Sequence, residues 1–369
     1  MKKGLKIFGK AIIYISGFVV ALILLALFII RINSSEKPEP IVDAEGKGLP
    51  NSVALIKDTT INGASQRLTI RGHDKSNPVL LRIHGGPGEF HMPQFNKFSG
   101  NDLEDIFTVC YWDQRGAGPA YSESLPDSSI TLKNIVKDGL AISRYLIEKF
   151  GKEKIYLEGN SWGTVVGAYM VKEDPELFKA YFGVGQSSNL LENEILSYNF
   201  ALTEATRNND TLSILKLKKL GSPPYPSKEE ATNAVPIQRS VLVKYATNNL
   251  HFSNSDLMKL VLLYDGWSMG FKWDILTKGK YGISAPILWK ETMVDLNLID
   301  NMPEWPIPVY IFQGSEDHFA ETSLAKEYFD SISAPTKEFY LFDGNGHMAS
   351  AENPKRYREL LQSILKQTE

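Results

Sequence analysis

The chain has 369 residues, of which 22% are charged and 43% are hydrophobic, and its formal net charge is −3 at pH 7. This composition is that of an ordinary globular protein with a large core, and the charge gives no indication of a nucleic-acid partner. The single cysteine, Cys110, excludes a disulfide within the chain. No cluster of cysteine and histidine in the sequence indicates a metal site, and we expect no cofactor.

The N-terminal region contains a long apolar segment. Residues 11–30 carry no charged side chain, and lysines occupy positions 2, 3, 6 and 10 before it. About 20 apolar residues in a helix span one hydrocarbon core, and the positive-inside rule places the lysine-rich end in the cytoplasm. The sequence therefore predicts an anchor over 1–31 that crosses the cell membrane once, with the rest of the chain extracytoplasmic.

A cleaved signal peptide is the alternative interpretation of this segment. The apolar core of such a peptide has about 7–15 residues and is followed by a site of small residues. Here the apolar run is longer, and the residues at its end, Ile-Ile-Arg-Ile-Asn at 29–33, do not form such a site, which favours an uncleaved anchor. Residues 32–50 contain prolines, serines and several charges, a composition that is typical of a polar tether.

A glycine-rich loop follows the strand pattern at 79–83. Its sequence, at 84–88, is His-Gly-Gly-Pro-Gly. Glycines let backbone N–H groups approach a reacting oxygen closely, and Pro87 stiffens the loop. An ordinary tight turn is the other interpretation. Two adjacent glycines and a Pro-Gly pair directly after a buried strand favour a loop that donates one N–H to an oxyanion hole.

Strand and helix patterns alternate on both sides of this loop. Residues 107–111 form an apolar run in which we expect Cys110 to be a small core side chain. Residues 132–150 show a helical pattern that ends at Gly151. Such alternation predicts an α/β protein with a mostly parallel sheet covered by helices.

A Gly-x-Ser-x-Gly pentapeptide occupies 159–163, between a strand pattern at 154–158 and a helical pattern at 164–170. This context predicts a sharp strand-to-helix turn that exposes the hydroxyl of Ser161. The backbone N–H of Trp162, the next residue, would then be a second donor of the oxyanion hole. A glycine- and serine-rich turn without chemistry is the alternative, and the segments downstream argue against it.

A long stretch in the second half of the chain lacks clear strand patterns. It begins with a helical pattern at 192–207 and contains Trp267, Trp273 and Trp289. We interpret it as a helical cap inserted into the core. The tryptophans either line a substrate pocket or pack the interior of the helical unit. The predicted core comprises residues 51–186 and 306–369. The predicted cap comprises residues 187–305.

Two further strand patterns, 308–312 and 338–342, each end in a glycine-containing loop with an ionisable side chain. Asp317 follows the first strand pattern and His347 follows the second. With Ser161 they stand in the order serine, acid, histidine, which is the order found in α/β-hydrolases. The alternatives that remain open are Glu316 or Asp343 as the acid and His318 as the base.

These three side chains are what acyl transfer by a serine requires. A serine hydroxyl is a poor nucleophile until a base takes its proton, and an imidazole base needs a carboxylate to fix its tautomer and stabilise its charged form. We therefore expect Ser161 to be the nucleophile, Asp317 the acid and His347 the base. The other histidines lack this context and are expected at the surface or in packing: His73, His91 and His251.

Three motifs together resemble the proline iminopeptidase group of α/β-hydrolases. They are the loop at 84–88, the segment Trp-Asp-Gln-Arg-Gly-Ala-Gly at 112–118 and the pentapeptide at 159–163. The resemblance covers most of the chain from about residue 51 onward. It implies an α/β-hydrolase fold and an aminopeptidase that forms an acyl-enzyme on Ser161.

The resemblance also implies roles for individual residues. Gly86 and Trp162 would form the oxyanion hole, and Asp113 and Arg115 would be structural supports beside the site. Asn160 occupies a position that is often glycine in the true iminopeptidases, and the cap does not carry their substrate-binding pattern.

The residues leave two other functions open. One is a carboxylesterase of small esters with the same triad, and the other is a non-catalytic binding protein with the same fold. The expected partners are a small peptide or ester substrate and the membrane. An exopeptidase must also hold a protonated amine, which needs a carboxylate in a partly desolvated pocket. Glu192, Glu194 and Glu204 in the cap are candidates, and solvated positions for all three are the alternative.

Overall fold

The computed structural model describes residues 2–250, 253–278, 284–293 and 295–368. The described chain divides into two compact units. The smaller contains Met1–Glu39 and Phe252–Gly279, and the larger contains Pro40–His251 and Lys280–Glu369. A segment from the middle of the chain therefore groups with the N-terminus, which no sequence pattern predicted.

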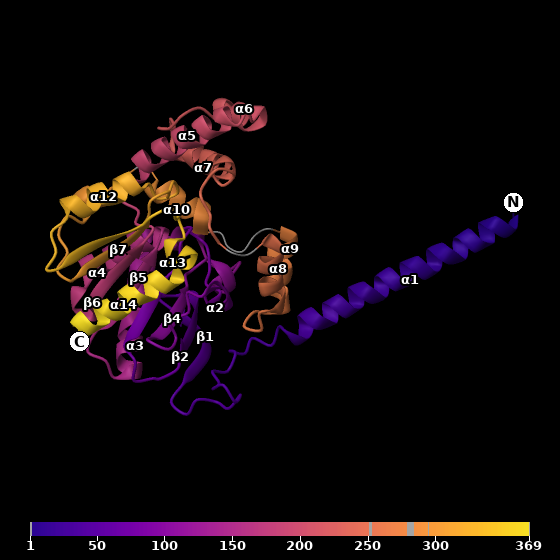
Figure 1. Cartoon of the computed structure of the whole chain (residues 1–369), viewed down its shortest axis with the longest axis horizontal. Helices are drawn as coiled ribbons and strands as arrows, with labels where there is room; N and C mark the ends of the chain where they lie inside the picture. Colours follow the sequence, from indigo (N-terminus) through magenta and orange to yellow (C-terminus); the bar gives the residue numbers. More distant parts are fainter. Residues whose placement is uncertain (1, 251–252, 279–283, 294, 369) are drawn as a thin grey trace. The chain divides into compact units, whose positions relative to one another are not determined.

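Among the described residues, the larger unit holds one eight-stranded sheet (Figure 1). Its strands are β1 Val53–Ile61, β2 Ala64–Gly72, β3 Val79–Ile83, β4 Thr108–Asp113, β5 Ile155–Asn160, β6 Phe178–Val184, β7 Val309–Gly314 and β8 Lys337–Phe342. They lie in the order β1-β2-β4-β3-β5-β6-β7-β8. β2 pairs antiparallel with β1 and β4, whereas the later neighbours are parallel, which confirms the mostly parallel sheet.

Helices of the larger unit connect the strands. α3 spans Leu132–Phe150 and begins after Thr131, whose hydroxyl accepts a hydrogen bond from the backbone N–H of Asn134. It ends where Gly151 turns left-handed with φ 60°, so the predicted helix is confirmed together with its end. The other helices of this unit are α2 Pro93–Ser99, α4 Trp162–Glu173, α5 Leu190–Arg207, α6 Thr211–Leu220, α7 Lys228–Leu242, α10 Ser284–Thr292, α11 Leu298–Asn301, α12 Thr322–Ser331, α13 Ala349–Glu352, α14 Pro354–Thr368 and the 3-10 helices Gly118–Ala120, Asp127–Ser129 and Pro175–Leu177.

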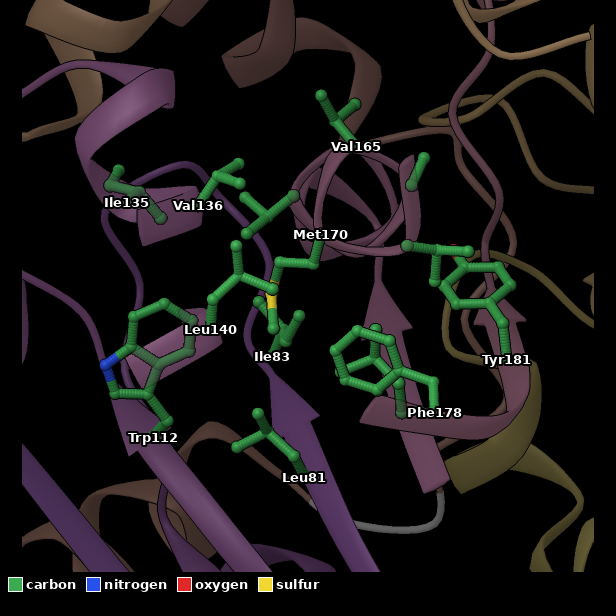
Figure 2. Close-up of a cluster of buried hydrophobic side chains, with 14 of the residues drawn as sticks. Leu81, Ile83, Trp112, Ile135, Val136, Leu140, Val165, Met170, Phe178 and Tyr181 are labelled. Carbon is green, nitrogen blue, oxygen red and sulfur yellow. The ribbon is translucent and has the colours of Figure 1, made fainter. Parts of the chain in front are cut away.

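Apolar clusters lie on both faces of the sheet. Leu81 and Ile83 of β3 join the cluster that packs against α3 and α4, whereas Leu80, which precedes them, joins the other, as the two-residue repeat of a strand requires. Figure 2 shows the first cluster, in which Leu140 of α3 lies near the β3 side chains. The second contains Tyr357 of α14. Because helices cover both faces, these strands are continuous apolar runs, which made them recognisable in the sequence.

The segment predicted as the cap contributes helices to both units. In the larger unit α5, α6 and α7 pack against one another, and α10 packs against α7. Trp289 of α10 is partly buried against Val235 and Met293. The remaining part of the segment groups with the N-terminus in the smaller unit. The boundaries of the cap at 187 and 305 stay a prediction.

The smaller unit contains α1 Lys2–Ile32, α8 Asn254–Leu263 and α9 Met269–Lys278. Within α1, Ile12–Ile32 is long and apolar enough to cross a membrane, with a mean hydropathy of 2.9 and no burial inside the protein. It is the one described helix with these properties. A signal sequence near an N-terminus has them too, so either origin is compatible with this helix.

An aromatic cluster holds α8 and α9 together. The ring of Trp267 lies edge-on to Tyr264 and Phe271, with centroids 5.0 and 5.2 Å away. Trp267 is 1% exposed and packs the interior of this helical pair, whereas Trp273 is 55% exposed. Of the two interpretations of the tryptophans, interior packing therefore holds for Trp267.

Candidate active site

The candidate residues follow the carboxyl ends of neighbouring parallel strands. β3 ends at Ile83 before the glycine-rich loop, and its neighbour β5 ends at Asn160 before Ser161. β7 and β8 are also neighbours, and they end before the loops of Asp317 and His347. Ligands bind at this edge of an open α/β sheet, so the topology brings the predicted loops to one functional edge.

Ser161 occupies a strained turn between β5 and α4. Its φ of 51° and ψ of −118° lie outside the regions that L residues prefer. A Cβ on Gly159 would lie 2.5 Å from the carbonyl oxygen of Gly163, and one on Gly163 would lie 2.3 Å from that of Ile83. Close backbone approach therefore requires both glycines, and the turn has the strand-to-helix form that the pentapeptide predicts.

Asp317 and His347 meet across the ends of β7 and β8. Nδ1 of His347 lies 2.8 Å from Oδ2 of Asp317, whose side chain is buried. Nε2 of Gln313 donates to the same oxygen at 2.9 Å. Oδ1 accepts hydrogen bonds from the backbone N–H groups of Phe319 and Ala320, each at 2.9 Å. Both oxygens are held, so the carboxylate has a fixed orientation toward the imidazole.

His347 lies close to the backbone that supports Ser161. Cε1 of His347 lies 3.0 Å from the position that a Cβ on Gly185 would take. The residue before Gly185, Val184, accepts a hydrogen bond through its carbonyl oxygen from the backbone N–H of Ser161 at 2.9 Å. Desolvation opposes the charged form of the imidazole, but the Asp317 carboxylate outweighs it and raises the pKa of His347 above its ordinary value. With Nδ1 held by Asp317, Nε2 is the ring nitrogen left to act as a base.

The alternative acids and base lie elsewhere. Glu316 and Asp343 are exposed. The ring of His318 stacks on Phe200 with centroids 3.5 Å apart, and its Nδ1 lies 3.2 Å from Oε1 of Glu321. The geometry therefore favours the acid and the base that the sequence analysis preferred.

The histidines expected at the surface or in packing include one of each kind. His73 is exposed, and His91 packs edge-on against the rings of His84 and Tyr111. Burial lowers the pKa of His84 to about 4, which keeps it neutral. His251 lies outside the described residues. Within the part of the chain that the structure describes, no cluster of histidine, cysteine and carboxylate side chains is arranged to hold a metal ion.

The predicted oxyanion-hole residues come from two elements beside the serine. Trp162 is the first residue of α4, where N–H groups have no partner within the helix and the helix dipole favours negative charge. Gly86 has a φ of 112°, which is accessible to glycine and strained for other residues. A Cβ on Gly85 would lie 3.2 Å from Cβ of Ser161, so this loop runs directly along the serine.

Asp113 and Arg115 make structural contacts. Nε and Nη2 of Arg115 donate to the two carboxylate oxygens of Asp138 on α3 at 2.6 and 2.7 Å, and the pair is buried. Gln66 of β2 adds a hydrogen bond to Asp138 at 2.7 Å. Asp113 accepts a hydrogen bond from the backbone N–H of His91 at 2.7 Å. These contacts tie β2, α3 and the loop after β4 together.

Comparisons with known proteins agree with this fold. Residues 78–216 match the family described as the alpha/beta hydrolase fold. The chain is similar to YbaC, a probable aminopeptidase of Bacillus subtilis, with 26% identity over 321 residues, 84% of this chain and 96% of that protein. A proline iminopeptidase of Lactobacillus delbrueckii subsp. bulgaricus is 24% identical over 80% of this chain and 92% of its own length.

Solved structures show the same similarity. A proline iminopeptidase-related protein of Thermus thermophilus matches 85% of this chain and 98% of its own, with a TM-score of 0.61 and 18% identity. The proline iminopeptidase of Mycobacterium smegmatis matches the same shares with a TM-score of 0.56 and 16% identity. The chain has the α/β-hydrolase fold, and proline iminopeptidases are among its relatives. A hydrolase related to aminopeptidases is therefore the activity class that its relatives support.

Glu89 of this α/β-hydrolase is a site residue that the sequence analysis missed. Its Oε2 lies 3.1 Å from the position that a Cβ on Gly85 would take, and Cβ of Ser161 lies 3.2 Å from the same position. The residue keeps exposed surface, yet the surrounding protein desolvates its carboxyl and raises its pKa, an effect that His347 partly offsets. The signal that pointed to it was a charged residue immediately after the glycine-rich loop.

The three cap glutamates of the hydrolase have different surroundings. Glu194 is buried, pairs with Arg239 of α7 and accepts a hydrogen bond from Nε2 of Gln238 at 3.0 Å. Glu204 is partly exposed and pairs with Arg207 on its own helix at 2.7 Å. Glu192 is partly buried in the first turn of α5. Since Arg239 already balances the charge of Glu194, this carboxylate is engaged in a structural ion pair.

Proposed function

We propose that this protein is a membrane-anchored serine aminopeptidase that forms an acyl-enzyme on Ser161. The observation that carries the proposal is the Asp317–His347 hydrogen bond of 2.8 Å at the same sheet edge as the strained turn of Ser161. The names of the relatives, a probable aminopeptidase and proline iminopeptidases, support a substrate with a free amine.

In the proposed reaction, Nε2 of His347 takes the proton of the Ser161 hydroxyl as Oγ attacks the carbonyl carbon of the first peptide bond. The N–H groups of Gly86 and Trp162 hold the negative charge that develops on the carbonyl oxygen. The C–N bond then breaks, and the protonated His347 donates its proton to the leaving amine. Water activated by the same histidine finally releases the amino acid from Ser161.

Glu89 supplies negative charge where an aminopeptidase needs it. The α-ammonium of a peptide lies one carbon from the carbonyl that Ser161 attacks, so its partner has to lie near the nucleophile. The carboxylate of Glu89 lies beside the same backbone position as Ser161. Because the surrounding protein partly desolvates this carboxyl, an ion pair formed there is stronger than one in water. We therefore assign ammonium binding to Glu89.

The membrane part of the proposal rests on α1. Its apolar stretch Ile12–Ile32 has the length of a membrane span, and lysines cluster at its N-terminal end. We expect the full-length chain to fractionate with membranes and its larger unit to be digested by protease added from outside the cell. Release of a shortened soluble chain would indicate a cleaved signal peptide, and digestion only from the cytoplasmic side would reverse the orientation.

Two substrates test the activity of the full-length protein in detergent micelles: an aminoacyl arylamide and a neutral chromogenic ester. Glu89→Gln should lower kcat/KM for the arylamide by about tenfold or more, because the ammonium loses its carboxylate partner, and should change kcat/KM for the ester far less. Glu123→Gln, at an exposed position, is the matched control. Ester turnover without arylamide turnover would favour a carboxylesterase. Absence of turnover and of fluorophosphonate labelling in the unmodified protein would favour a binding protein.

A further inference from the structure

The segment that contains α8 and α9 is hydrogen-bonded to the residues directly after α1. Ser35 donates from its backbone N–H and its hydroxyl to the two carboxylate oxygens of Asp265, at 2.8 and 2.7 Å. The backbone N–H of Glu36 donates to the carbonyl oxygen of Asp265 at 2.9 Å. Asp265 lies between α8 and α9, so the turn of the helical pair is fastened to the end of α1.

Lys272 of α9 makes a second connection at the same place. Its side chain is completely buried, and Nζ donates to the carbonyl oxygens of Asn33 and, at 2.9 Å, of Leu262. Asn33 directly follows α1, and Leu262 belongs to the last turn of α8. The carboxyl end of a helix favours a cation, so one ammonium holds two helix ends together. These contacts place the helical pair at the residues where the membrane-length stretch of α1 ends.

The same helical pair exposes large apolar side chains. Those on α8 and α9 that are more than a third exposed are Leu257, Met258, Leu263, Trp273 and Leu276. Removal of such apolar surface from water is favourable. Tryptophan side chains are enriched at the boundary between lipid and water, and Trp273 is 55% exposed.

We propose that the α8–α9 segment lies on the surface of the bilayer that α1 crosses, with its exposed apolar side chains among the lipid headgroups and acyl-chain ends. The inference rests on the membrane anchor of the proposed function. Its basis is that the membrane-length stretch and the contacts to α8 and α9 adjoin in the chain. The apolar stretch of α1 ends at Ile32, and the hydrogen bonds to α8 and α9 begin at Asn33. A surface fastened one residue beyond a membrane span meets lipid headgroups before any other partner.

Single cysteines in the full-length protein test this placement. The native Cys110 is buried, and burial raises the pKa of its thiol, so it does not compete for labelling. Met258→Cys and Leu276→Cys carry an environment-sensitive fluorophore in phospholipid nanodiscs that contain lipids with quenchers at shallow or deep positions. Leu22→Cys in α1 and Leu212→Cys, an 80% exposed leucine of the larger unit, are the controls.

We expect shallow quenchers to reduce the fluorescence at positions 258 and 276 about threefold more than at position 212, because the labels lie in the headgroup region. Deep quenchers should act on position 22. If the label at position 22 is quenched but the labels at positions 258 and 276 are quenched no more than the label at position 212, this inference is overturned and the anchor stays intact. Absence of quenching at 22 would remove the anchor itself, whereas arylamide turnover reports separately on the peptidase activity.

Discussion

Nε2 of Gln313 donates hydrogen bonds to Oδ2 of Asp317 at 2.9 Å and to the carbonyl oxygen of Ala320 at 2.8 Å. Its Oε1 accepts a hydrogen bond from the backbone N–H of Gln186 at 2.8 Å. The amide is completely buried within β7. The proposed catalytic acid is therefore oriented by a side chain of the sheet as well as by its own loop.

Replacement of Gln313 tests this positioning role. Gln313→Leu should lower kcat by about tenfold to a hundredfold with little change in KM, because a displaced carboxylate misaligns the imidazole without touching the substrate. Stopped-flow or steady-state kinetics with the ester substrate measure the effect, and circular dichroism checks the fold. An unchanged kcat in a folded variant would show that the loop alone orients Asp317.

The nucleophile assignment is tested by Ser161→Ala. Turnover should fall by about three orders of magnitude or more and fluorophosphonate labelling should disappear, because the remaining groups only bind the substrate and hold its oxyanion. Alanine adopts the φ of 51° about as readily as serine does, so the fold should persist. Ser124→Ala, at an exposed serine, is the control. Labelling that survives in Ser161→Ala would place the nucleophile elsewhere.

The pH dependence of kcat/KM reports on His347. The imidazole must be neutral to act as a base, and its raised pKa moves the acid limb of the profile above the ordinary histidine value of 6.5. Asp317→Asn removes the carboxylate, so the midpoint should fall and kcat should drop by about 10⁴-fold. Asp343→Asn, at the exposed alternative acid, should change neither. An equal loss in both variants would contradict the assignment of the acid.

The raised pKa also makes a prediction about stability. The folded pKa of His347 lies above its unfolded value, so its pairing with Asp317 stabilises the fold fully below the unfolded pKa. This contribution is lost as the pH rises through the folded pKa. The free energy of unfolding in urea should therefore show this loss with rising pH in the unmodified protein. Asp317→Asn, which lacks the pair, should not show it. Identical pH dependence in the two proteins would argue against the shift.

Glu194 should matter for stability more than for substrate selection. Glu194→Gln leaves Arg239 without its partner next to a buried position and should lower the free energy of unfolding by on the order of 3 kcal/mol. Glu204→Gln removes a solvent-exposed ion pair on the same helix and should cost less than about 1 kcal/mol. Chemical denaturation compares them. A selective loss of arylamide turnover in Glu194→Gln would instead move ammonium binding from Glu89 to Glu194.

Truncation should distinguish the anchor from the contacts that follow it. A chain that begins at Asn33 keeps the acceptors and donors of Lys272 and Asp265, whereas one that begins at Pro40 loses them. Both should retain ester turnover, but trypsin should cut α8 and α9 faster in the shorter chain, because the buried ammonium of Lys272 loses the carbonyl of Asn33 and Asp265 loses the donors of Ser35. Equal rates of cleavage would show that these contacts do not hold the segment.

Much of the fold and of the candidate site was predictable because the signals are local. Strands buried on both faces appear as apolar runs, and α3 ends where glycine is needed for a left-handed turn. The pentapeptide around Ser161 and the loop before Gly86 combine glycine spacing with a strand end, and backbone sterics act over just such short distances. The order of the three side chains along the sequence, serine then acid then histidine, pointed to Asp317 and His347.

Other features were decided only by the tertiary structure, because they depend on contacts between residues far apart in the chain. Strand register places Asp317 rather than Glu316 or Asp343 against His347, and the packing of the glycine-rich loop brings Glu89 beside Ser161. The segment 252–279 joins the N-terminus through hydrogen bonds that connect positions 230 residues apart. No periodicity or motif encodes such pairs, because their geometry exists only after the intervening chain has folded.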